Sequence, residues 1–228
     1  MNARKFLDGS LMSAIAQIGR CGLFLVTLLA ALPASLRHAR ETVRQVWFVG
    51  AMSLTIIMVC GLFVGMVLML QLYHVLSIFG GTSASGMVVA LSVYRELGPV
   101  VTALLFAGRA GTALTAEIGL MKAGEQLSAM EMMAVDPIRR VLAPRFWAGV
   151  FTMPLLAAVF SAVGVLGGWV VGVLMIGVDP GAFWSQMQGG VDVWKDVGNG
   201  VLKSLAFGFT VTFIALLQGF EARPTPEG

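Results

Sequence analysis

Charged residues inside apolar segments are the first candidates for chemistry in this sequence. Arg95, Glu96 and Arg109 all lie within one long apolar stretch. A charged side chain at the centre of a bilayer costs about 2.5–3.5 kcal/mol or more, so it should face protein, water or a ligand. Glu96 is therefore predicted either to line a cavity or to form a structural ion pair. Because Arg95 is adjacent on the helix, a partner for Glu96 must come from another helix or chain.

A second candidate is a polar, methionine-rich segment at residues 117–136, which separates two apolar stretches. Helical spacing places mainly apolar side chains on one face and methionines with charges on the other. Methionine adapts to a partner's pocket and charges fix register, so the segment is predicted to be a docking helix, and the alternative is a solvated loop. The predicted inner face consists of Leu120, Ala123, Leu127, Met130 and Ala134. Asp136 and Pro137 should end the helix.

No motif for catalysis appears in the sequence. The absence of a GxxxxGK[ST] stretch means that the chain does not hold ATP phosphates in that way itself. HExxH and GxSxG are absent, and His38 and His74 are isolated. Cys21 and Cys60 lie in apolar segments without metal-ligand spacing, which favours buried thiols over a disulfide or a metal site. We therefore expect no catalytic residue, no metal and no cofactor in this chain.

The composition defines the class of protein. Of 228 residues, 57% are hydrophobic and 12% are charged, with a mean hydropathy of +0.87. So much apolar surface must be solvated by lipid. The basic residues form no stripe, which excludes a nucleic-acid partner. A bilayer needs roughly 20 apolar residues per helix. Four segments satisfy this length, and they predict an all-α, polytopic transmembrane bundle: 46–79, 86–120, 146–178 and 201–220.

The connecting segments predict the orientation. Basic residues precede the first span and recur between the second and third, whereas acidic residues outnumber basic ones between the third and fourth. The positive-inside rule then places the N-terminus, the segment 117–136 and the C-terminal tail in the cytoplasm. Glycines at four-residue spacing, such as Gly61 and Gly65, predict close helix packing, in a bundle or a dimer.

Two further helices are expected at the membrane surfaces. Residues 1–35 contain an apolar run too short to span, which favours an interfacial helix over a cleaved signal peptide. Residues 180–198 repeat aromatic and aliphatic side chains at helical spacing. The two tryptophans in that segment suit a periplasmic headgroup layer, so an aromatic anchor is favoured over a ligand site.

Several motifs together resemble the MlaE (YrbE) permease family, and the similarity runs over nearly the whole chain. They are Arg95–Pro99, Phe106–Gly111, Ala116–Gly119, Glu125-Gln126, Met130–Pro137 and Arg145–Gly149. The resemblance implies a membrane subunit of an ABC transporter in the Gram-negative inner membrane, which maintains the lipid asymmetry of the outer membrane. It also implies a homodimer. The implied partners are a cytoplasmic ATPase that binds ATP and magnesium, a small STAS-domain protein and a periplasmic MCE-domain hexamer.

The resemblance also assigns residues. A phospholipid cavity open to the periplasm would be lined by Leu68, Val75, Leu76, Phe79, Glu96 and Leu97. The segment 117–136 would be the coupling helix that meets the ATPase, through Glu117, Gly119, Met121, Lys122, Glu125, Gln126, Met132, Met133 and Asp136. The family pattern continues past Gly228 into a further membrane helix, which this sequence lacks.

Two other functions remain open at this point. An ion-coupled secondary transporter would use Glu96 as its proton or ion site and would need no ATPase. A membrane scaffold would bind the same partners and move no lipid.

Overall fold

The chain folds into helices in the part that the structure describes. The computed structural model covers the backbone of residues 2–31 and 39–222, with side chains described for residues 15–31 and 40–222. The α-helices are α1 (Asn2–Ala30), α3 (Ala39–Ile78), α4 (Ser85–Ser92), α5 (Gly98–Phe106), α6 (Thr112–Ala123), α7 (Gln126–Met132), α8 (Ala143–Trp169), α9 (Pro180–Gly190) and α10 (Gly198–Glu221).

Several α-helices continue into one another through wider π-helical turns, so that the long helices are only locally interrupted. The π-helical turns are η2 (Val93–Leu97), η3 (Ala107–Gly111), η4 (Ile138–Leu142), η5 (Val170–Met175) and η6 (Val193–Val197). A single 3₁₀ turn, η1 (Thr82–Ala84), precedes α4. Such π turns often mark functional positions in helices.

Four continuous helices of the described chain are long and apolar enough to cross a membrane, which confirms the predicted polytopic bundle. They cover Arg40–Ile78, Thr82–Ala123, Ile138–Met175 and Val193–Glu221. The first begins before the predicted 46–79 because helical hydrogen bonding continues through the basic residues that precede the apolar run. At about 1.5 Å per residue, a helix of 39 residues exceeds a bilayer core of roughly 30 Å, so its ends extend beyond it.

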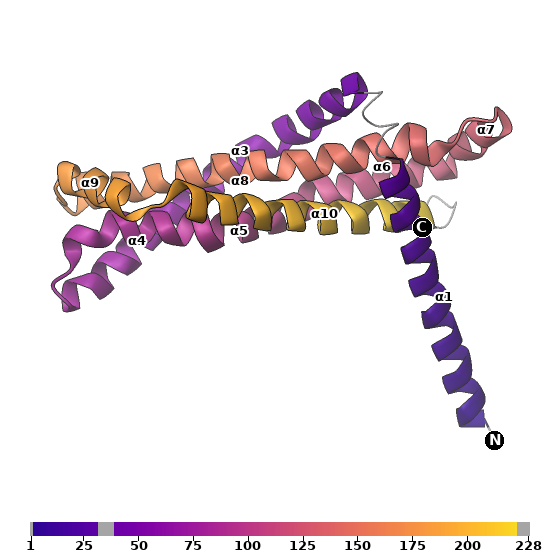
Figure 1. The fold of residues 1–228 in the computed structure, drawn as a ribbon, viewed down its shortest axis with the longest axis horizontal. Coiled ribbons are helices and arrows are strands. Elements are labelled where there is room, and N and C mark those ends of the chain that lie inside the picture. The colour runs from indigo at the N-terminus through magenta and orange to yellow at the C-terminus, as the bar shows by residue number, and fades with distance from the viewer. Residues whose placement is uncertain (1, 32–38, 223–228) are drawn as a thin grey trace.

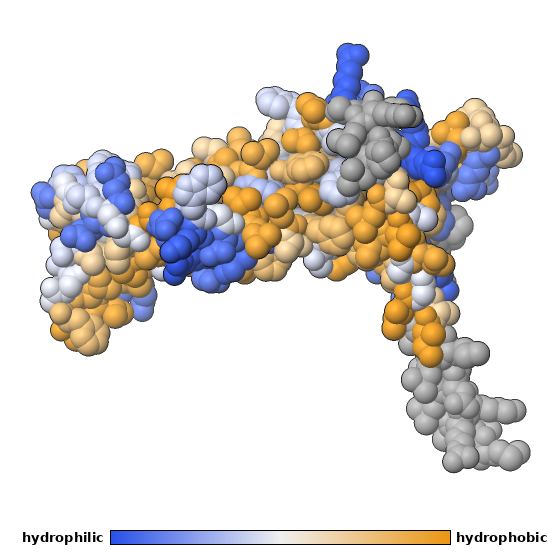
Figure 2. Space-filling view, viewed as in Figure 1, coloured by the Kyte–Doolittle hydropathy of each residue, from blue (hydrophilic) through white to orange (hydrophobic). Residues whose placement is uncertain are grey.

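The spans lie side by side in an elongated bundle (Figure 1). The turn that carries α7 is at one end, and α9 packs against α4 at the other. Helix α1 runs across the direction of the bundle and meets it near the α7 end. Hydrophobic residues cover most of the middle of the face shown in Figure 2, while hydrophilic residues gather nearer the ends. This distribution is the one that a lipid environment requires.

Helices α3 and α8 form the tightest pair in the bundle. A Cβ atom added at Gly65 would overlap the carbonyl group of Gly164, and one at Gly61 would stand 2.9 Å from the carbonyl oxygen of Phe160. Gly167 faces the backbone of Leu62 in the same way. The predicted close approach through glycines therefore occurs within one chain, between the first and third spans.

Helix α1 is fixed to the bundle through its second half. Phe24 and Leu28 are buried, and the Phe24 ring stacks on Phe220 at a centroid distance of 5.5 Å. Ile15 and Ile18, by contrast, are exposed. This combination of a docked end and exposed apolar side chains is typical of a helix that lies along a membrane surface.

Candidate functional site

Two ion pairs join the second span to the fourth near the α9 end of the bundle. Arg95 Nε donates to Asp196 Oδ1 at 2.6 Å, and Lys203 Nζ donates to Glu96 Oε1 at 2.7 Å. Asp196 is almost fully buried, and its second oxygen accepts from the backbone N–H of Asp192 at 2.9 Å. The Glu96 carboxylate is more exposed than Asp196. As expected, the partner of Glu96 comes from another helix.

Lys203 has a second role that follows from the proline in this span. Pro99 lacks an N–H group, so the carbonyl four residues earlier, that of Arg95, loses its helical donor. Lys203 Nζ donates to this carbonyl oxygen at 2.9 Å. The backbone responds with the π-helical turn η2 directly before the proline. Before Pro99 the helix therefore has a widened turn, and a lysine from α10 satisfies the carbonyl group that the proline leaves without a donor.

The residues predicted to line a lipid cavity lie on two helices. Leu68 packs against the main core cluster, whereas Val75 and Phe79 are exposed. Leu68 and Val75 share one side of α3, since a seven-residue step returns to the same face, and Phe79 lies in the turn directly after this helix. Glu96 and Leu97 lie on η2, where the described polar contacts of Glu96 are with α10. In a single chain, the side chains of Val75 and Phe79 therefore remain at least partly uncovered.

At the opposite end, a third ion pair holds the second span to the third span. The Arg145 guanidinium donates to both carboxylate oxygens of Glu117, at 2.5 and 3.4 Å, and also to the carbonyl of Val141. The Arg145 side chain is only 12% exposed. Bidentate pairs of this kind fix geometry as well as charge. Glu117, predicted to contact a partner, is therefore at least partly engaged within its own chain.

The two layers of ion pairs are separated by the thickness of a bilayer. Glu117 follows Glu96 by 21 positions, which at about 1.5 Å per residue is about 31 Å along the helix. On α10, Glu221 follows Lys203 by 18 positions, or about 27 Å. A hydrocarbon core measures about 30 Å. The spacing between the two layers of ion pairs therefore matches the thickness of a hydrocarbon core.

The segment 117–136 is not one continuous helix, and this corrects its predicted faces. Helix α6 ends at Ala123, Glu125 adopts a left-handed backbone conformation with φ of 55°, and α7 begins at Gln126. The helical phase therefore restarts at the break. Leu120, predicted to face inward, is 71% exposed, whereas Met121 packs against the core and Lys122 donates to the carbonyl of Phe220 at 2.6 Å. Leu127 is buried and Met130 packs against the core, as predicted.

The segment also ends earlier than Asp136. Ala134 has φ of 58°, and the N–H of Val135 donates to the carbonyl of Met130 at 2.9 Å, a pattern that closes helix C-termini. Asp136 accepts from the N–H of Ile138 at 2.9 Å and pairs with Arg139. Met132 and Met133, beside this turn, are among the most exposed apolar residues of the chain. Together with Glu125 and Gln126, they form an uncovered surface, which we call the α7 turn surface.

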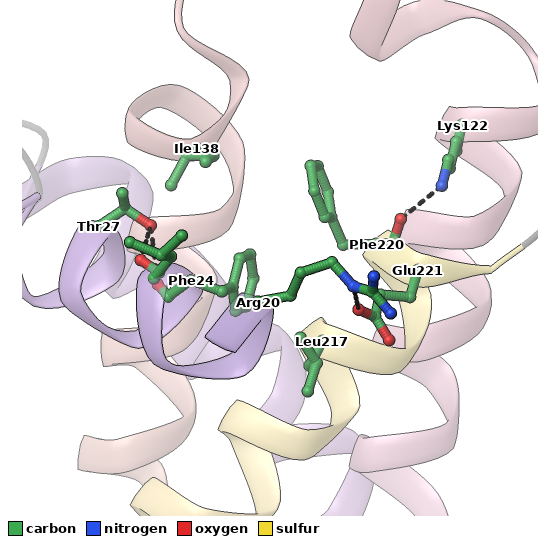
Figure 3. Close-up of a pocket in the computed structure, with 9 residues that line it drawn as sticks. Arg20, Phe24, Thr27, Lys122, Ile138, Leu217, Phe220 and Glu221 are labelled. Atoms are coloured by element: carbon green, nitrogen blue, oxygen red, sulfur yellow. Dashed lines mark hydrogen bonds and ion pairs between the residues drawn. The ribbon is translucent and has the colours of Figure 1, made fainter. Parts of the chain in front are cut away.

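A cavity of about 590 Å³ lies where α1 meets the bundle (Figure 3). Its wall includes Phe24 from α1 and Phe220 from α10, and Arg20 reaches across it to the Glu221 carboxylate at 3.4 Å. Lys122 lies on the far side, with its ammonium group at the end of α10. These contacts tie the surface helix, α6 and the end of the fourth span together.

Sequence reasoning did not find three of the charged residues in these layers as partners. Lys203, Asp196 and Arg145 provide the opposite charges for Glu96, Arg95 and Glu117. A signal was available for Lys203, because it is a lone charge inside the fourth apolar stretch and so required a partner of opposite sign.

Helices of spanning length, with charged pairs about one bilayer thickness apart, are the architecture of a multi-pass membrane protein. The chain belongs to the MlaE permease family: the family model described as Permease MlaE matches residues 42–228.

Individual relatives agree with this assignment. The intermembrane phospholipid transport system permease protein MlaE of Haemophilus influenzae is 56% identical over 211 residues, which cover 92% of this chain and 81% of the relative. A probable ABC transporter permease protein of Synechocystis is 37% identical, over 84% of this chain and 72% of the relative. One of Rickettsia typhi is 35% identical, over 81% and 71%.

Proposed function

We propose that this chain is the permease subunit of an ABC transporter that moves phospholipids between the inner membrane and a periplasmic MCE-domain protein, and so maintains the lipid asymmetry of the outer membrane. The observation that carries the proposal is the 56% identity, over 92% of the chain, to a permease of an intermembrane phospholipid transport system. The spanning helices and their charged edges are compatible with that role.

The proposed energy source is a cytoplasmic ATPase that binds ATP and magnesium, with a small STAS-domain protein beside it. The α7 turn surface is the proposed contact, since Met132 and Met133 are exposed and adaptable while Leu127 and Met130 anchor the turn to the bundle. Glu117, Gly119, Met121, Lys122 and Asp136 then act behind this surface as its support. A push on the turn would reach the bundle through Glu117–Arg145 and Lys122–Phe220.

The proposed lipid path uses a homodimer. Leu68, Val75, Leu76 and Phe79 of each copy would line the cavity between copies, with Glu96 and Leu97 at its periplasmic edge. Support comes from the exposure of Val75 and Phe79, which a second copy or a lipid would cover. The MCE-domain hexamer would receive the lipid on this side. An apolar lining of this kind selects acyl chains rather than a head group.

The test is to purify the tagged protein from native membranes with its bound partners. The complex is then placed in vesicles containing a fluorescent phospholipid. We expect an ATPase to co-purify and ATP to drive lipid transfer to acceptor vesicles, with no effect of an ionophore. Transfer that follows an ion gradient and ignores ATP would identify a secondary transporter instead. Partner binding with no lipid transfer under any condition would identify a scaffold.

Changing the α7 turn surface tests the coupling. Met132→Glu with Met133→Glu should lower ATP-driven lipid transfer about tenfold or more, because charges would replace two apolar side chains that the proposed partner covers. Leu104→Ala, an exposed position within the second span, is the matched control for the loss of apolar surface. Normal transfer in the double variant would contradict the proposed contact.

A further inference from the structure

Arg109 is a charge inside the membrane-embedded part that neither layer of ion pairs uses. It precedes Glu117 by eight positions, so it lies about 12 Å deeper than the inner edge of the bilayer core. Its side chain makes no hydrogen bond or ion pair with any residue that the structure describes. A guanidinium remains charged at this depth, so it needs an anion or water beside it.

The backbone around Arg109 leaves room for such an anion. Arg109 is exposed and lies in the π-helical turn η3, which widens the helix at this point. A Cβ atom at the neighbouring Gly108 would have no heavy atom within 4 Å. There is therefore open space directly beside Arg109.

A cavity of about 220 Å³ begins at this arginine and extends between α3 and α6 toward the inner edge. Met52 and Leu114 contribute apolar walls, and Ser53 is also one of the lining residues. Ser53 is 1% exposed, and its hydroxyl finds no hydrogen-bond partner in the described part of the chain. A buried hydroxyl without a partner is costly, and a ligand that supplies an acceptor would remove this cost.

The chemistry of the cavity selects one class of ligand. Arg109 offers several N–H donors in a planar fork, and Ser53 can add one more donor. Glu117 also borders the cavity, but its carboxylate is bound by Arg145 and does not neutralise Arg109. Within the hydrocarbon region, the anion that fits a guanidinium bidentately is the phosphate of a membrane lipid. The cavity is too small for an entire phospholipid, so the acyl chains would lie outside it against the exposed flank of α3.

We propose that Arg109 and Ser53 form an inner phosphate site, where a phospholipid of the inner leaflet is held on the cytoplasmic side of the lipid path. This site is separate from the predicted cavity at Glu96, which lies 13 positions earlier, or about 20 Å along the helix. The inference rests on the proposed transport of phospholipids and adds a second lipid-binding site to the proposed path.

The experiment uses the complex purified from native membranes and placed in vesicles of phosphatidylethanolamine and phosphatidylglycerol. One probe is phosphatidylethanolamine with a photoreactive group near the glycerol, and the other is diacylglycerol with the same group and no phosphate. After illumination, labelled peptides are quantified by mass spectrometry. We expect the phospholipid probe to label the α3 segment 48–53, and the diacylglycerol probe to label it about tenfold less, as expected for losing one charge-assisted contact.

Variants define the site. Arg109→Gln should lower labelling of residues 48–53 about tenfold, Arg109→Lys should restore most of it, and Ser53→Ala should lower it by a smaller factor. Arg139→Gln is the matched control, because Arg139 is exposed and pairs with Asp136 outside the spans. Size-exclusion profiles check folding, and Ser53→Ala carries the test if Arg109→Gln does not fold.

The outcomes separate this inference from the function on which it rests. Equal labelling by both probes, or labelling unchanged in the Arg109→Gln and Ser53→Ala variants, would overturn the inner phosphate site. A change of oligomeric state in Arg109→Gln with labelling unchanged would assign the arginine to contact with a second copy and would also overturn it. Label on residues 68–79 in the same sample reports the outer cavity, and its absence together with absent ATP-driven transfer would contradict the proposed function itself.

Discussion

Lys203 satisfies two groups at once at the α9 end of the bundle. It pairs with the Glu96 carboxylate, and it donates to the Arg95 carbonyl that Pro99 leaves without a helical donor. The lysine is 40% exposed and the glutamate 67%, so the ion pair alone contributes little. We therefore expect a substitution of Lys203 to act mainly through the lost contact with the Arg95 carbonyl.

Replacing Lys203 with methionine should lower stability by about 1–2 kcal/mol, because a carbonyl and a carboxylate both lose their donor. Glu96→Gln is the control, since it removes one charge and leaves the contact to the carbonyl. It should cost less than about 0.5 kcal/mol. Unfolding of the detergent-solubilised protein measures both, and equal losses in the two variants would show that the backbone contact has no special weight.

The sequence predicts that Glu96 needs a partner from another helix, but it does not identify that partner. The reason is geometric: Lys203 lies 107 positions away, and its height relative to Glu96 depends on how the second and fourth spans align. The same holds for Arg145 and Glu117. One apolar segment is enough to predict that a charge within it is buried. Predicting its partner requires knowing how two helices pack against each other.

At the scale of elements, the turn around α7 depends on two residues with left-handed backbone, and neither is glycine. Glu125 and Ala134 have φ of 55° and 58°. A side chain in this conformation costs about 1–2 kcal/mol, which only the surrounding structure can offset. Helix α7 is therefore a short rigid turn between two strained points rather than part of a long helix.

Replacing Ala134 with glycine should raise stability by up to about 1 kcal/mol, because glycine adopts positive φ without strain. The matched variant Ala129→Gly, inside α7, should lower stability by about 1 kcal/mol through helix propensity. Thermal unfolding of both variants provides the comparison. A loss of stability in Ala134→Gly would indicate that the methyl group contributes more than the strain costs.

The α3–α8 contact gives a second prediction for the elements. Gly65→Ala should destabilise the protein by about 2–4 kcal/mol, since the new methyl group would overlap the Gly164 carbonyl and force the helices apart. Gly50→Ala on the same helix is the control, because its Cβ would meet the Thr152 methyl group at an ordinary 3.5 Å. Folded yield and thermal unfolding would distinguish them, and similar values for both would argue against a backbone contact at Gly65.

The glycine spacing predicted close packing but not the partner helix, and the periodicity of 117–136 predicted a helix but not its break. Both failures have one cause. A spacing describes a face of a helix that is assumed to be continuous, and it contains no information about which element that face meets. The break at Glu125 is also hidden from local rules, because a left-handed glutamate follows Gly124, where the glycine would be expected to take that conformation.

For the whole molecule, the alternation of basic and acidic connectors predicts that the α7 turn and α9 lie on opposite sides of the membrane. Single cysteines at Met132 and Gln188, in a background with Cys21 and Cys60 replaced by alanine, test this. Both positions are exposed. A membrane-impermeant thiol reagent should label the Gln188→Cys variant in cells with permeabilised outer membranes, and the Met132→Cys variant only in inverted vesicles from which peripheral proteins have been washed. Labelling of both from one side would refute the topology.

The four spans could be predicted from hydropathy because each contains enough apolar residues to cross a bilayer, and all four are present. Their ends could not, since helices such as α3 continue beyond the apolar run into water or the headgroup layer. The predicted lipid-lining residues depend on family resemblance, and several remain exposed in one chain. What covers them is a property of the assembly, which no pattern within a single span encodes.

The glycine contacts between α3 and α8 also limit which parts of the bundle can move. Where the backbones of α3 and α8 touch directly, no change of side-chain rotamer can alter the distance between the helices. The first and third spans therefore behave as one rigid pair. Helix α10 meets this rigid pair through Phe209 on Phe146 and through close contacts at two glycines, Gly208 against Met153 and Gly149 against Thr212. Any conformational change during transport must therefore occur in the helices around this rigid pair, while the two helices of the pair keep their packing.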